Sequence, residues 1–489
     1  MLHIHEEAAR CLLCEDAPCT KACNTSDPAR AIRAIRFHNE KNAWRWLEGS
    51  TDADLERAEQ ACIHYDKPIR IRELAAALRP SDRDAAASKP LKDANDVSLA
   101  ITFCDIPCEN PFFLASSAVC TNYEMVARAF EAGWGGVFYK TICKQDIREV
   151  SPRFDAVKDD TRFTGFRNME QLSENPYDVD FDILRRLKQN YPSKIVVASI
   201  MGQFEEEWAE LAKMAEDAGC DAVELNFSCP QMRLSGLGSD VGQNPELVTF
   251  YTVYVKRAVK IPVIPKMTPN ITQINNPAMG AYFAGADAIS AINTIKSVTM
   301  ATEAEVSEQK TISGYSGRSV KPIALRCILE MARNAIMKNV QFSGIGGIEN
   351  WRDALEFIQL GCRNVQVCTA VMQYGYRIID DLILGLQTYM AERGIDRLED
   401  LVGEQLSSFV LPGDLDRETI VYPKIDREKC VGCGRCYISC QDGGHQAISF
   451  DKEKRQPHIV GTKCVGCHLC RLVCPTGAIG LTKRISKKH

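Results

Sequence analysis

The chain of 489 residues lacks the features of an exported, membrane-spanning or nucleic-acid-binding protein. No apolar run approaches the ~18 residues that a membrane-spanning helix needs. The opening residues, MLHIHEEAARCLLC, contain neither a basic region nor an apolar core, so no export signal is predicted. A formal net charge of -5 provides no basic surplus for nucleic acid or an anionic membrane. These absences predict a cytoplasmic protein with no nucleic-acid or membrane partner.

The central region lacks histidine, because all eight histidines lie outside residues 97–390. Acid–base chemistry in that region must therefore use another side chain. Among the alternatives only a thiol titrates near neutral pH, with an ordinary pKa of ~8.5. No Gly-x-Gly-x-x-Gly motif follows any predicted strand, so a dinucleotide-binding Rossmann fold is not indicated.

Cysteine, in contrast, is abundant. In a reducing compartment, tightly grouped cysteines indicate metal binding or catalysis rather than disulfide bonds. Of the 22 cysteines, five precede residue 65, eight follow residue 429 and nine are scattered between. This distribution divides the chain into three regions. Together with the cysteine spacing within each region, it predicts an α-helical iron–sulfur domain at 1–84, a central domain at 97–400 and a ferredoxin-like domain at 421–485.

The C-terminal cysteines form two runs with the spacing C-x2-C-x2-C-x3-C. This spacing lets three thiolates of one run bind a 4Fe–4S cluster, while the fourth cysteine binds the other cluster. Zinc knuckles are the alternative, but they usually use two CxxC pairs or mixed Cys/His sets. The predicted ligands are Cys430, Cys433, Cys436 and Cys474 for one cluster, and Cys464, Cys467, Cys470 and Cys440 for the other.

The N-terminal cysteines are Cys11, Cys14, Cys19 and Cys23, with Cys62 further along the chain. The segment between them is predicted to contain helix, because Asp27 can cap it, Pro28 suits a first turn, and apolar residues recur at helical spacing. Five cysteines in so short a region indicate a further cluster. A zinc site or a vestigial structural motif is the alternative.

The middle of the chain contains eight β-rich runs separated by amphipathic segments that end at or near glycine. Eight such repeats fit a parallel (β/α)8 barrel, an α/β fold. A doubly wound sheet is the alternative architecture, but it usually has fewer strands. The predicted strands lie at 111–117, 136–142, 194–200, 222–228, 262–268, 288–294, 340–347 and 364–370.

Seven of these eight runs end in residues unusual for a core, at the end of the barrel where active sites occur. The sequence SGIGGI after the seventh strand suits a phosphate, because glycine lets backbone N–H groups approach it. Cys229, in LNFSCPQM, could be a buried hydrophobe, a cluster ligand or a catalyst. The missing histidines favour Cys229 as a proton donor.

These motifs, including LASS, YKT, GFRNMEQ, LNFSCPQM, KMTPN, AINT, SGYSG and SGIGGI, resemble the FMN- and pyrimidine-binding A subunit of bacterial NAD-dependent dihydropyrimidine dehydrogenases. The resemblance covers about residues 95–489, and the barrel of that family is similar to that of dihydroorotate dehydrogenase. It implies Cys229 as the catalytic acid and Lys266 as a stabiliser of negative charge. It implies FMN contacts from Ala115, Ser116, Lys140, Thr141, Lys266, Gly317, Gly346, Gly347, Cys368 and Thr369, and pyrimidine contacts from Asn168, Asn226, Phe227, Ser228, Asn293 and Thr294.

The N-terminal region resembles the helical cluster-bearing domain of the family's partner subunit and of glutamate synthase small subunits. That resemblance implies one 4Fe–4S cluster, held by Cys11, Cys14, Cys19 and Cys62. Such domains usually hold two clusters, but only Cys23 remains for the second, which we expect to be lost.

The resemblance also implies a reaction and a partner. Uracil or thymine would be reduced, with electrons from a separate subunit that binds FAD and NAD(P)H. Two alternatives are a dihydroorotate-type dehydrogenase and a non-catalytic electron-relay subunit. The first is disfavoured because FTGFRNMEQ lacks the Gly-Leu-Pro-Asn stretch associated with that family.

Overall fold

The computed structural model describes the chain except residues 1–3, 81–92, 160–161, 230–237, 299–310 and 488–489. The chain forms two compact units, Met1–Leu406 and Ser407–His489. No helix in the described part of the chain is long and apolar enough to cross a membrane.

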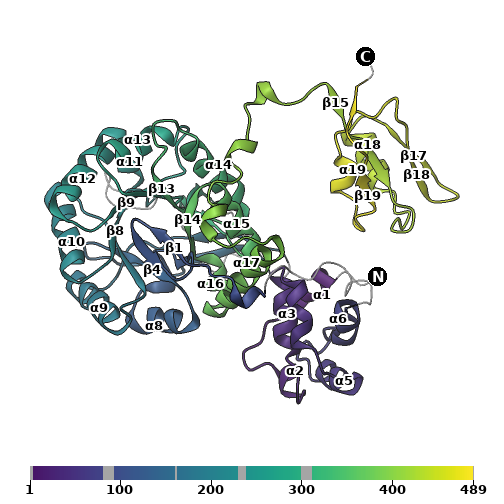
Figure 1. Cartoon of the computed structure of the whole chain (residues 1–489), viewed down its shortest axis with the longest axis horizontal. Coiled ribbons are helices and arrows are strands. Elements are labelled where there is room, and N and C mark those ends of the chain that lie inside the picture. Colours follow the sequence, from purple (N-terminus) through teal and green to yellow (C-terminus); the bar gives the residue numbers. More distant parts are fainter. Residues whose placement is uncertain (1–3, 81–92, 160–161, 230–237, 299–310, 488–489) are drawn as a thin grey trace. The chain divides into compact units, whose positions relative to one another are not determined.

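The centre of the first unit is a closed barrel of eight parallel strands, surrounded by helices (Figure 1). The prediction of a (β/α)8 barrel is confirmed, and the doubly wound alternative is wrong. Each predicted run contains one strand of the barrel or overlaps it. In order, the strands are β3 (Phe112–Leu114), β4 (Gly136–Ile142), β7 (Ile195–Ile200), β8 (Ala222–Asn226), β9 (Val263–Met267), β10 (Ala288–Ala291), β13 (Gln341–Ile345) and β14 (Cys362–Val367).

The barrel strands are mostly apolar because both faces are covered, one by the barrel interior and the other by helices. Every residue of β4, β7 and β8 is buried. Helices α8, α10 and α15 end at or near a glycine, as the sequence predicts. For example, Asn122 caps α8, and Gly133 ends it with φ of 110°. The outer helices are α8 (Tyr123–Ala132), α9 (Tyr177–Asn190), α10 (Glu205–Asp217), α12 (Pro245–Ala258), α13 (Asn275–Phe283), α14 (Lys321–Ala332), α15 (Trp351–Gln359) and α17 (Ile379–Arg393).

A second, antiparallel sheet was not predicted. It has the order β11 (Ile295–Ser297), β12 (Ser313–Ser316), β6 (Arg162–Asn168) and β5 (Phe154–Asp159). Its strands come from the segments that follow β4 and β10. In its register Asn168 lies opposite Gly314 on one side and Phe154 on the other. This sheet contributes residues to the main cavity described below.

The N-terminal helices of the first unit have a hydrophobic core of their own, which includes Ile32, Ile35, Leu55 and Leu74. The predicted helix after Asp27 is confirmed, since the Asp27 carboxylate accepts a hydrogen bond from Arg30 N at 3.0 Å. The helices are α1 (Ile4–Arg10), α2 (Pro18–Lys21), α3 (Pro28–Arg36), α4 (Glu40–Ala43), α5 (Asp52–Gln60) and α6 (Ile71–Leu78).

Helix α3 (Pro28–Arg36) and the residues directly after it contact the barrel helices α15 and α17 through polar groups. Arg33 forms an ion pair of 2.7 Å with Asp381, and Asn39 Nδ2 donates to the Asp381 carbonyl at 2.8 Å. Trp351 Nε1 donates to the His38 carbonyl at 3.0 Å. The N-terminal helices and the barrel therefore form one compact unit, and a separate domain at 1–84 stays a prediction.

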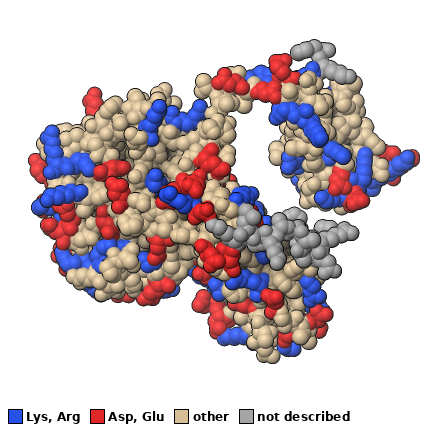
Figure 2. Space-filling view, in the orientation of Figure 1, with Lys and Arg blue, Asp and Glu red and all other residues tan. Residues whose placement is uncertain are grey.

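In its described part, the second unit contains three two-stranded sheets and two short α-helices. Helix α18 contains Cys436 and Cys440, whereas α19 contains Cys470 and ends before Cys474. Figure 2 shows Lys and Arg interspersed with Asp and Glu on the visible faces of both units. The elements are β15 (Thr419–Ile420), β16 (Pro423–Ile425), α18 (Arg435–Gly443), β17 (Ile448–Asp451), β18 (Gln456–Ile459), α19 (Leu469–Leu472), β19 (Ile479–Leu481) and β20 (Ile485–Ser486).

Candidate active site and metal centres

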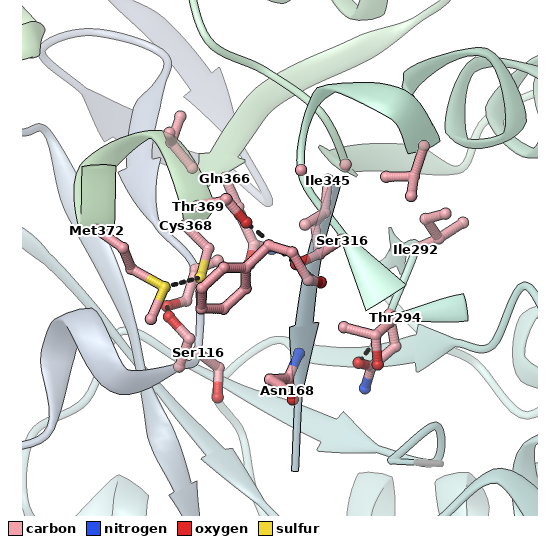
Figure 3. Close-up of a pocket in the computed structure, with 18 of the residues that line it drawn as sticks. Ser116, Asn168, Ile292, Thr294, Ser316, Ile345, Gln366, Cys368, Thr369 and Met372 are labelled. Carbon is pink, nitrogen blue, oxygen red and sulfur yellow. Dashed lines mark hydrogen bonds between the residues drawn. The ribbon is translucent and has the colours of Figure 1, made fainter. Parts of the chain in front are cut away.

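One cavity of the first unit, called the main cavity from here on, has a volume of about 120 Å³ and lies at the carboxyl ends of the barrel strands (Figure 3). Its lining draws on most of the barrel strands and on the second sheet. The structure brings together here, from the predicted residues, Ala115, Ser116, Lys140, Thr141, Asn168, Asn226, Cys229, Lys266, Asn293, Thr294, Gly317, Gly346, Gly347, Cys368 and Thr369.

Two predicted substrate residues do not line this cavity. The Phe227 ring is fully buried and packs against Trp208 and Tyr251, with ring centroids 5.0 and 6.4 Å away. The side chain of Ser228 is also fully buried, and it accepts a hydrogen bond from Asn293 Nδ2 at 2.8 Å. Phe227 therefore packs the end of β8 against the outer helices α10 and α12. Ser228 holds the amide of Asn293, which does line the cavity.

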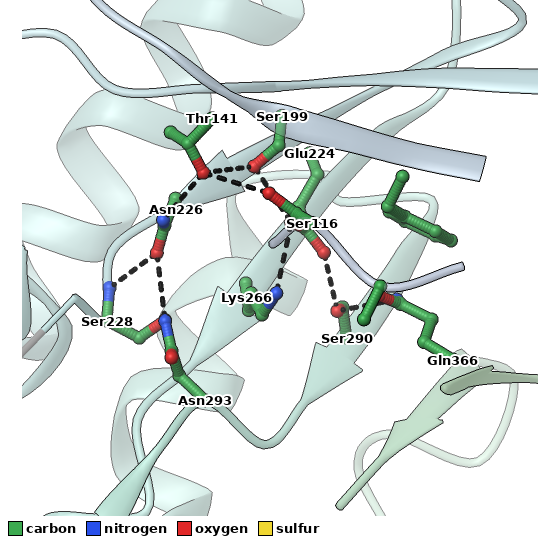
Figure 4. Close-up of polar contacts among 12 residues, drawn as sticks. Ser116, Thr141, Ser199, Glu224, Asn226, Ser228, Lys266, Ser290, Asn293 and Gln366 are labelled. Carbon is green, nitrogen blue, oxygen red and sulfur yellow. Dashed lines mark hydrogen bonds and ion pairs between the residues drawn. The ribbon is translucent and has the colours of Figure 1, made fainter. Parts of the chain in front are cut away.

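The asparagines belong to a hydrogen-bonded network at the cavity wall (Figure 4). Asn226 Nδ2 donates to Thr141 Oγ1 at 2.9 Å, and Asn293 Nδ2 donates to Asn226 Oδ1 at 3.2 Å. Thr141 also contacts the hydroxyls of Ser116 and Ser199 at 3.0 and 2.9 Å. Because these contacts join the ends of several strands, the network holds each amide in one orientation.

Lys266 reaches the same cavity from β9, and Glu224 inside the barrel is its counter-ion. Their closest atoms, Nζ and Oε1, are 3.4 Å apart. The Glu224 carboxylate also accepts hydrogen bonds from Ser199 and Ser290, at 2.9 and 2.8 Å. A buried carboxylate with three donors is well compensated, so Lys266 is held with its charge near the cavity.

Lys140 has a separate partner, Glu170, at 2.9 Å. Both residues line the cavity, and the Lys140 side chain is almost completely buried. Arg153 lies 3.8 Å from the same carboxylate. The cavity therefore contains two lysines, each placed by a carboxylate that the sequence analysis did not assign to the site.

Glycine is required at the turn after β13. Gly346 and Gly347 have φ of 127° and 77°, in the region that side chains disfavour. A Cβ on Gly347 would lie 2.8 Å from the backbone nitrogen of Lys321. The turn thus brings bare backbone to the cavity wall, which suits close approach of a phosphate group.

The cavity lining includes two thiols, Cys229 and Cys368. Burial raises the pKa of Cys368, and its Sγ lies 3.8 Å from the Met372 sulfur. Cys368 is therefore a neutral packing group at neutral pH. Cys229 is 7% exposed and follows β8, next to the asparagines. No histidine is among the described lining residues, so acid–base chemistry in this cavity must use another side chain, such as a thiol.

Residues of the second sheet and its connections were missed by sequence reasoning. Phe154, Phe166, Tyr315 and Ser316 line the cavity, and the Ser316 and Thr369 hydroxyls lie 3.1 Å apart. The pairing of Asn168 with Gly314 joins segments far apart in the chain, and no local periodicity reports such a contact. The motifs GFRNMEQ and SGYSG were the available signal.

The C-terminal unit contains two small cavities, each of about 20 Å³ and each lined by four cysteines. Each cavity combines three cysteines of one run with the last cysteine of the other. The first is lined by Cys430, Cys433, Cys436 and Cys474, and the second by Cys464, Cys467, Cys470 and Cys440. This crossed arrangement is the one used by two-cluster ferredoxins.

A third cavity of the same volume, about 20 Å³, lies among the N-terminal helices. Four thiols line it, those of Cys11, Cys14, Cys19 and Cys62, together with apolar residues such as Ile32. Cys23 does not line it, and its thiol instead donates to the Asp54 carbonyl at 3.5 Å. The four-thiol donor set and the matching volume fit a 4Fe–4S cluster here.

Residues 98–390 match the dihydroorotate dehydrogenase family, and residues 423–481 match the 4Fe-4S dicluster domain. The chain therefore belongs to the dihydroorotate dehydrogenase family and carries a 4Fe-4S dicluster domain after the barrel. Neither match extends before residue 98, so the resemblance expected for the N-terminal helices stays a prediction.

Named relatives narrow this class. The NAD-dependent dihydropyrimidine dehydrogenase subunit PreA of Escherichia coli K12 is 51% identical over 397 residues, covering 80% of this chain and 97% of that subunit. The chloroplastic dihydropyrimidine dehydrogenase (NADP(+)) of Arabidopsis thaliana is 36% identical over 350 residues, 68% of this chain and 80% of the plant protein. The catalytic subunit of dihydroorotate dehydrogenase B (NAD(+)) of Thermococcus kodakarensis is 35% identical over 309 residues, 62% of this chain and 97% of that subunit. The resemblance to bacterial dihydropyrimidine dehydrogenase subunits is confirmed.

Proposed function

We propose that this chain is the pyrimidine-reducing subunit of a cytoplasmic dihydropyrimidine dehydrogenase, which converts uracil or thymine to the 5,6-dihydro product. One observation carries the proposal: Cys229, two network asparagines and Lys266 line a single barrel cavity, in a chain 51% identical to a subunit named for that activity. The N-terminal helices, the barrel and the C-terminal unit act as three functional parts.

FMN fits the main cavity because backbone, hydroxyl and cationic groups lie together there. Gly346 and Gly347 suit its phosphate, while Ser116, Thr141 and Lys140 offer hydroxyl and ammonium groups near β3 and β4. When bound, FMN supplies the hydride for carbon 6 of the pyrimidine, and 4Fe–4S clusters in the three thiol-lined cavities supply its electrons.

The protein's own residues perform the remaining chemistry. The Cys229 thiol gives its proton to carbon 5 and is left as a thiolate, which regains a proton from solvent before the next turnover. Lys266 stabilises the negative charge that develops before this proton arrives. Asn226 and Asn293 bind the carbonyl and N–H edge of the ring, because an amide both donates and accepts. Asn168 and Thr294 complete the substrate contacts.

Electrons enter from a separate subunit that binds FAD and NAD(P)H. The name of the Escherichia coli relative describes it as one subunit of an NAD-dependent enzyme. The described barrel uses its main cavity for the flavin and the pyrimidine, and no Rossmann fingerprint occurs in the sequence. A partner flavoprotein supplies the missing nicotinamide site.

The test is an anaerobic visible spectrum of the purified protein, titrated with dihydrouracil and separately with dihydroorotate. The proposal predicts that the flavin is bleached by dihydrouracil and not by dihydroorotate. Bleaching by dihydroorotate alone would establish the dihydroorotate-type alternative instead. A bound flavin that neither compound reduces would indicate an electron-relay subunit.

A further inference from the structure

Arg36, the last residue of α3, is a buried cation beside the N-terminal thiols. Its side chain is 9% exposed, and its Nη1 donates to the Cys11 carbonyl at 2.7 Å. Its Nε has no hydrogen-bond partner, and no carboxylate of the described residues forms an ion pair with it. Buried charges are normally paired, so Arg36 calls for a counter-charge nearby.

Arg377 is a second cation on the same loop. Its Nη2 donates to the Leu13 carbonyl at 2.5 Å, and its Nη1 to the Cys14 carbonyl at 3.4 Å. Its nearest carboxylate, Glu15 at 3.7 Å, is 97% exposed and therefore strongly screened by water. Two guanidinium groups thus donate to backbone carbonyls in the segment from Cys11 to Cys14. The thiols of these two cysteines are two of the four that line the N-terminal cavity.

Arg33, one turn earlier on α3, shows the contrast. Its side chain also faces the barrel, but it forms ion pairs there: its Nε lies 2.7 Å from Asp381 Oδ2 and its Nη2 lies 3.2 Å from Asp380 Oδ2. Arg33 therefore fastens α3 to α17 without leaving net charge. Arg36 and Arg377 fasten the cysteine loop and do leave net positive charge.

These two cations also contact the helix that leads into the main cavity. Arg36 lies over the Tyr374 ring at 5.1 Å, and Arg377 Nε donates to the Tyr374 carbonyl at 3.2 Å. Tyr374 ends α16 (Thr369–Tyr374), and Thr369 and Met372 of this helix line the cavity (Figure 3). One short helix therefore separates the cysteine loop from the main cavity.

We propose that Arg36 and Arg377 are positioning residues for a 4Fe–4S cluster at the N-terminal thiols, that they raise its reduction potential, and that they place it on the electron route into the barrel. The inference rests on the proposed function and on a cluster at these cysteines. Reduction adds one negative charge to the cluster without making or breaking a bond. A fixed cation close to the cluster stabilises that added charge, and charge and hydrogen bonds both influence cluster potentials.

The test is an anaerobic redox titration of the full-length holoprotein with dithionite and mediators, followed by electron paramagnetic resonance. The variant Cys14→Ser identifies the signal of the N-terminal cluster. Arg36→Met and Arg377→Met should each lower the reduced-to-oxidised ratio of that signal about tenfold at the wild-type midpoint, which is 59 mV for one electron. Arg36→Lys keeps the charge and should restore most of the ratio, and Arg33→Met is the matched control that should not change it.

The proposed electron route from the N-terminal cluster to the flavin is tested by a second measurement on the same variants, the rate of flavin reduction. After rapid mixing with a reductant, flavin bleaching at 450 nm should lag in Arg377→Met and Arg36→Met and not in Arg33→Met. Unchanged potentials in both variants would overturn the inference, and so would an equal shift in Arg33→Met, which would show that only the packing of α3 matters. Wild-type protein with eight irons and no third signal would instead remove the N-terminal cluster itself.

Discussion

Lys266 and Glu224 form an ion pair inside the barrel, with Nζ 3.4 Å from Oε1 and with the carboxylate fully buried. The pair connects the main cavity, which Lys266 lines, with the barrel interior, where Glu224 is buried. Its two members differ in how they are compensated. Glu224 has Lys266 and two serine hydroxyls as donors, whereas Lys266 has only Glu224 among the described ion-pair partners.

Removal of one member of this pair should cost stability as well as activity. Lys266→Met leaves Glu224 without its cation, and a broken buried pair typically costs about 3–5 kcal/mol. The double variant Lys266→Met, Glu224→Gln should regain much of that cost, because no buried charge remains. Hydrogen exchange of the β8 and β9 amides measures the local free energy of opening. A double variant as unstable as the sum of both single variants would show that the two residues act independently.

Replacement of Cys229 by Ala should remove pyrimidine reduction and leave the flavin site intact. We expect turnover to fall by ~10² to 10⁴, the usual contribution of a positioned proton donor. Cys229→Ser should be nearly as damaging at neutral pH, because a hydroxyl is a far weaker acid than a thiol. The measurements are uracil-dependent oxidation of reduced flavin and, separately, flavin reduction by an artificial donor.

The matched control for Cys229 is Cys327→Ala, which removes a buried thiol from α14 outside the cavity lining. It should leave both rates near those of the wild-type protein. Near wild-type uracil reduction in Cys229→Ala would show that Cys229 is a packing residue.

The cysteine cavities predict the iron content. Three 4Fe–4S clusters give about twelve irons per chain, with four cysteines for each cluster. Cys62→Ser should lose about four of these irons, because Cys62 lines the N-terminal cavity. Cys23→Ser should retain all of them, since its thiol contacts the Asp54 carbonyl and not the cavity. Zinc in place of iron would overturn the assignment of the N-terminal site.

The contact between α1 and the segment before α6 should depend on pH through Glu7. Burial alone would raise the pKa of this carboxylate, but hydrogen bonds from Arg70 N at 2.9 Å and from the Arg70 and Arg10 guanidiniums outweigh it. The net effect lowers the pKa in the folded state. Stability from Glu7 is therefore fully present above the unfolded-state pKa, and it is lost as pH falls through the folded-state value.

Glu7→Gln should therefore destabilise the N-terminal helices by about 1.5–3 kcal/mol at pH 7, the range for hydrogen bonds to a charged group. The difference from the wild-type protein should fade as pH falls below about 4. Hydrogen exchange of α1 and α6 amides at both pH values provides the measurement. A difference that is independent of pH would mean that Glu7 acts by packing alone.

The barrel could be predicted because the hydrophobic periodicity of each strand and helix is a local property of the sequence. In a parallel barrel the carboxyl ends of all strands lie at one end, so the seven strand ends with residues unusual for a core had to lie close together. The second sheet was missed because its strands pair over long sequence separations, as Asn168 does with Gly314. Phe227 was expected to contact the substrate because the family resemblance implies it. Its ring points instead to Trp208, as alternation along a strand would allow. Glu224 and Glu170 were missed because nothing in the sequence marks them as buried. Their role becomes clear only when the structure shows the lysine that each of them contacts.

The last prediction concerns the source of electrons. Pyrimidine reduction consumes two electrons, and the main cavity is already proposed to hold both the flavin and the pyrimidine. A barrel that took hydride directly from a nicotinamide would gain nothing from thiol-lined cluster sites, which transfer electrons singly. The purified chain alone should therefore fail to reduce uracil with NADH or NADPH, yet should do so with reduced methyl viologen. Addition of an FAD- and NAD(P)H-binding partner should restore nicotinamide-dependent turnover. Robust NADH-dependent activity from the isolated chain would place a nicotinamide site within it and refute the need for a partner.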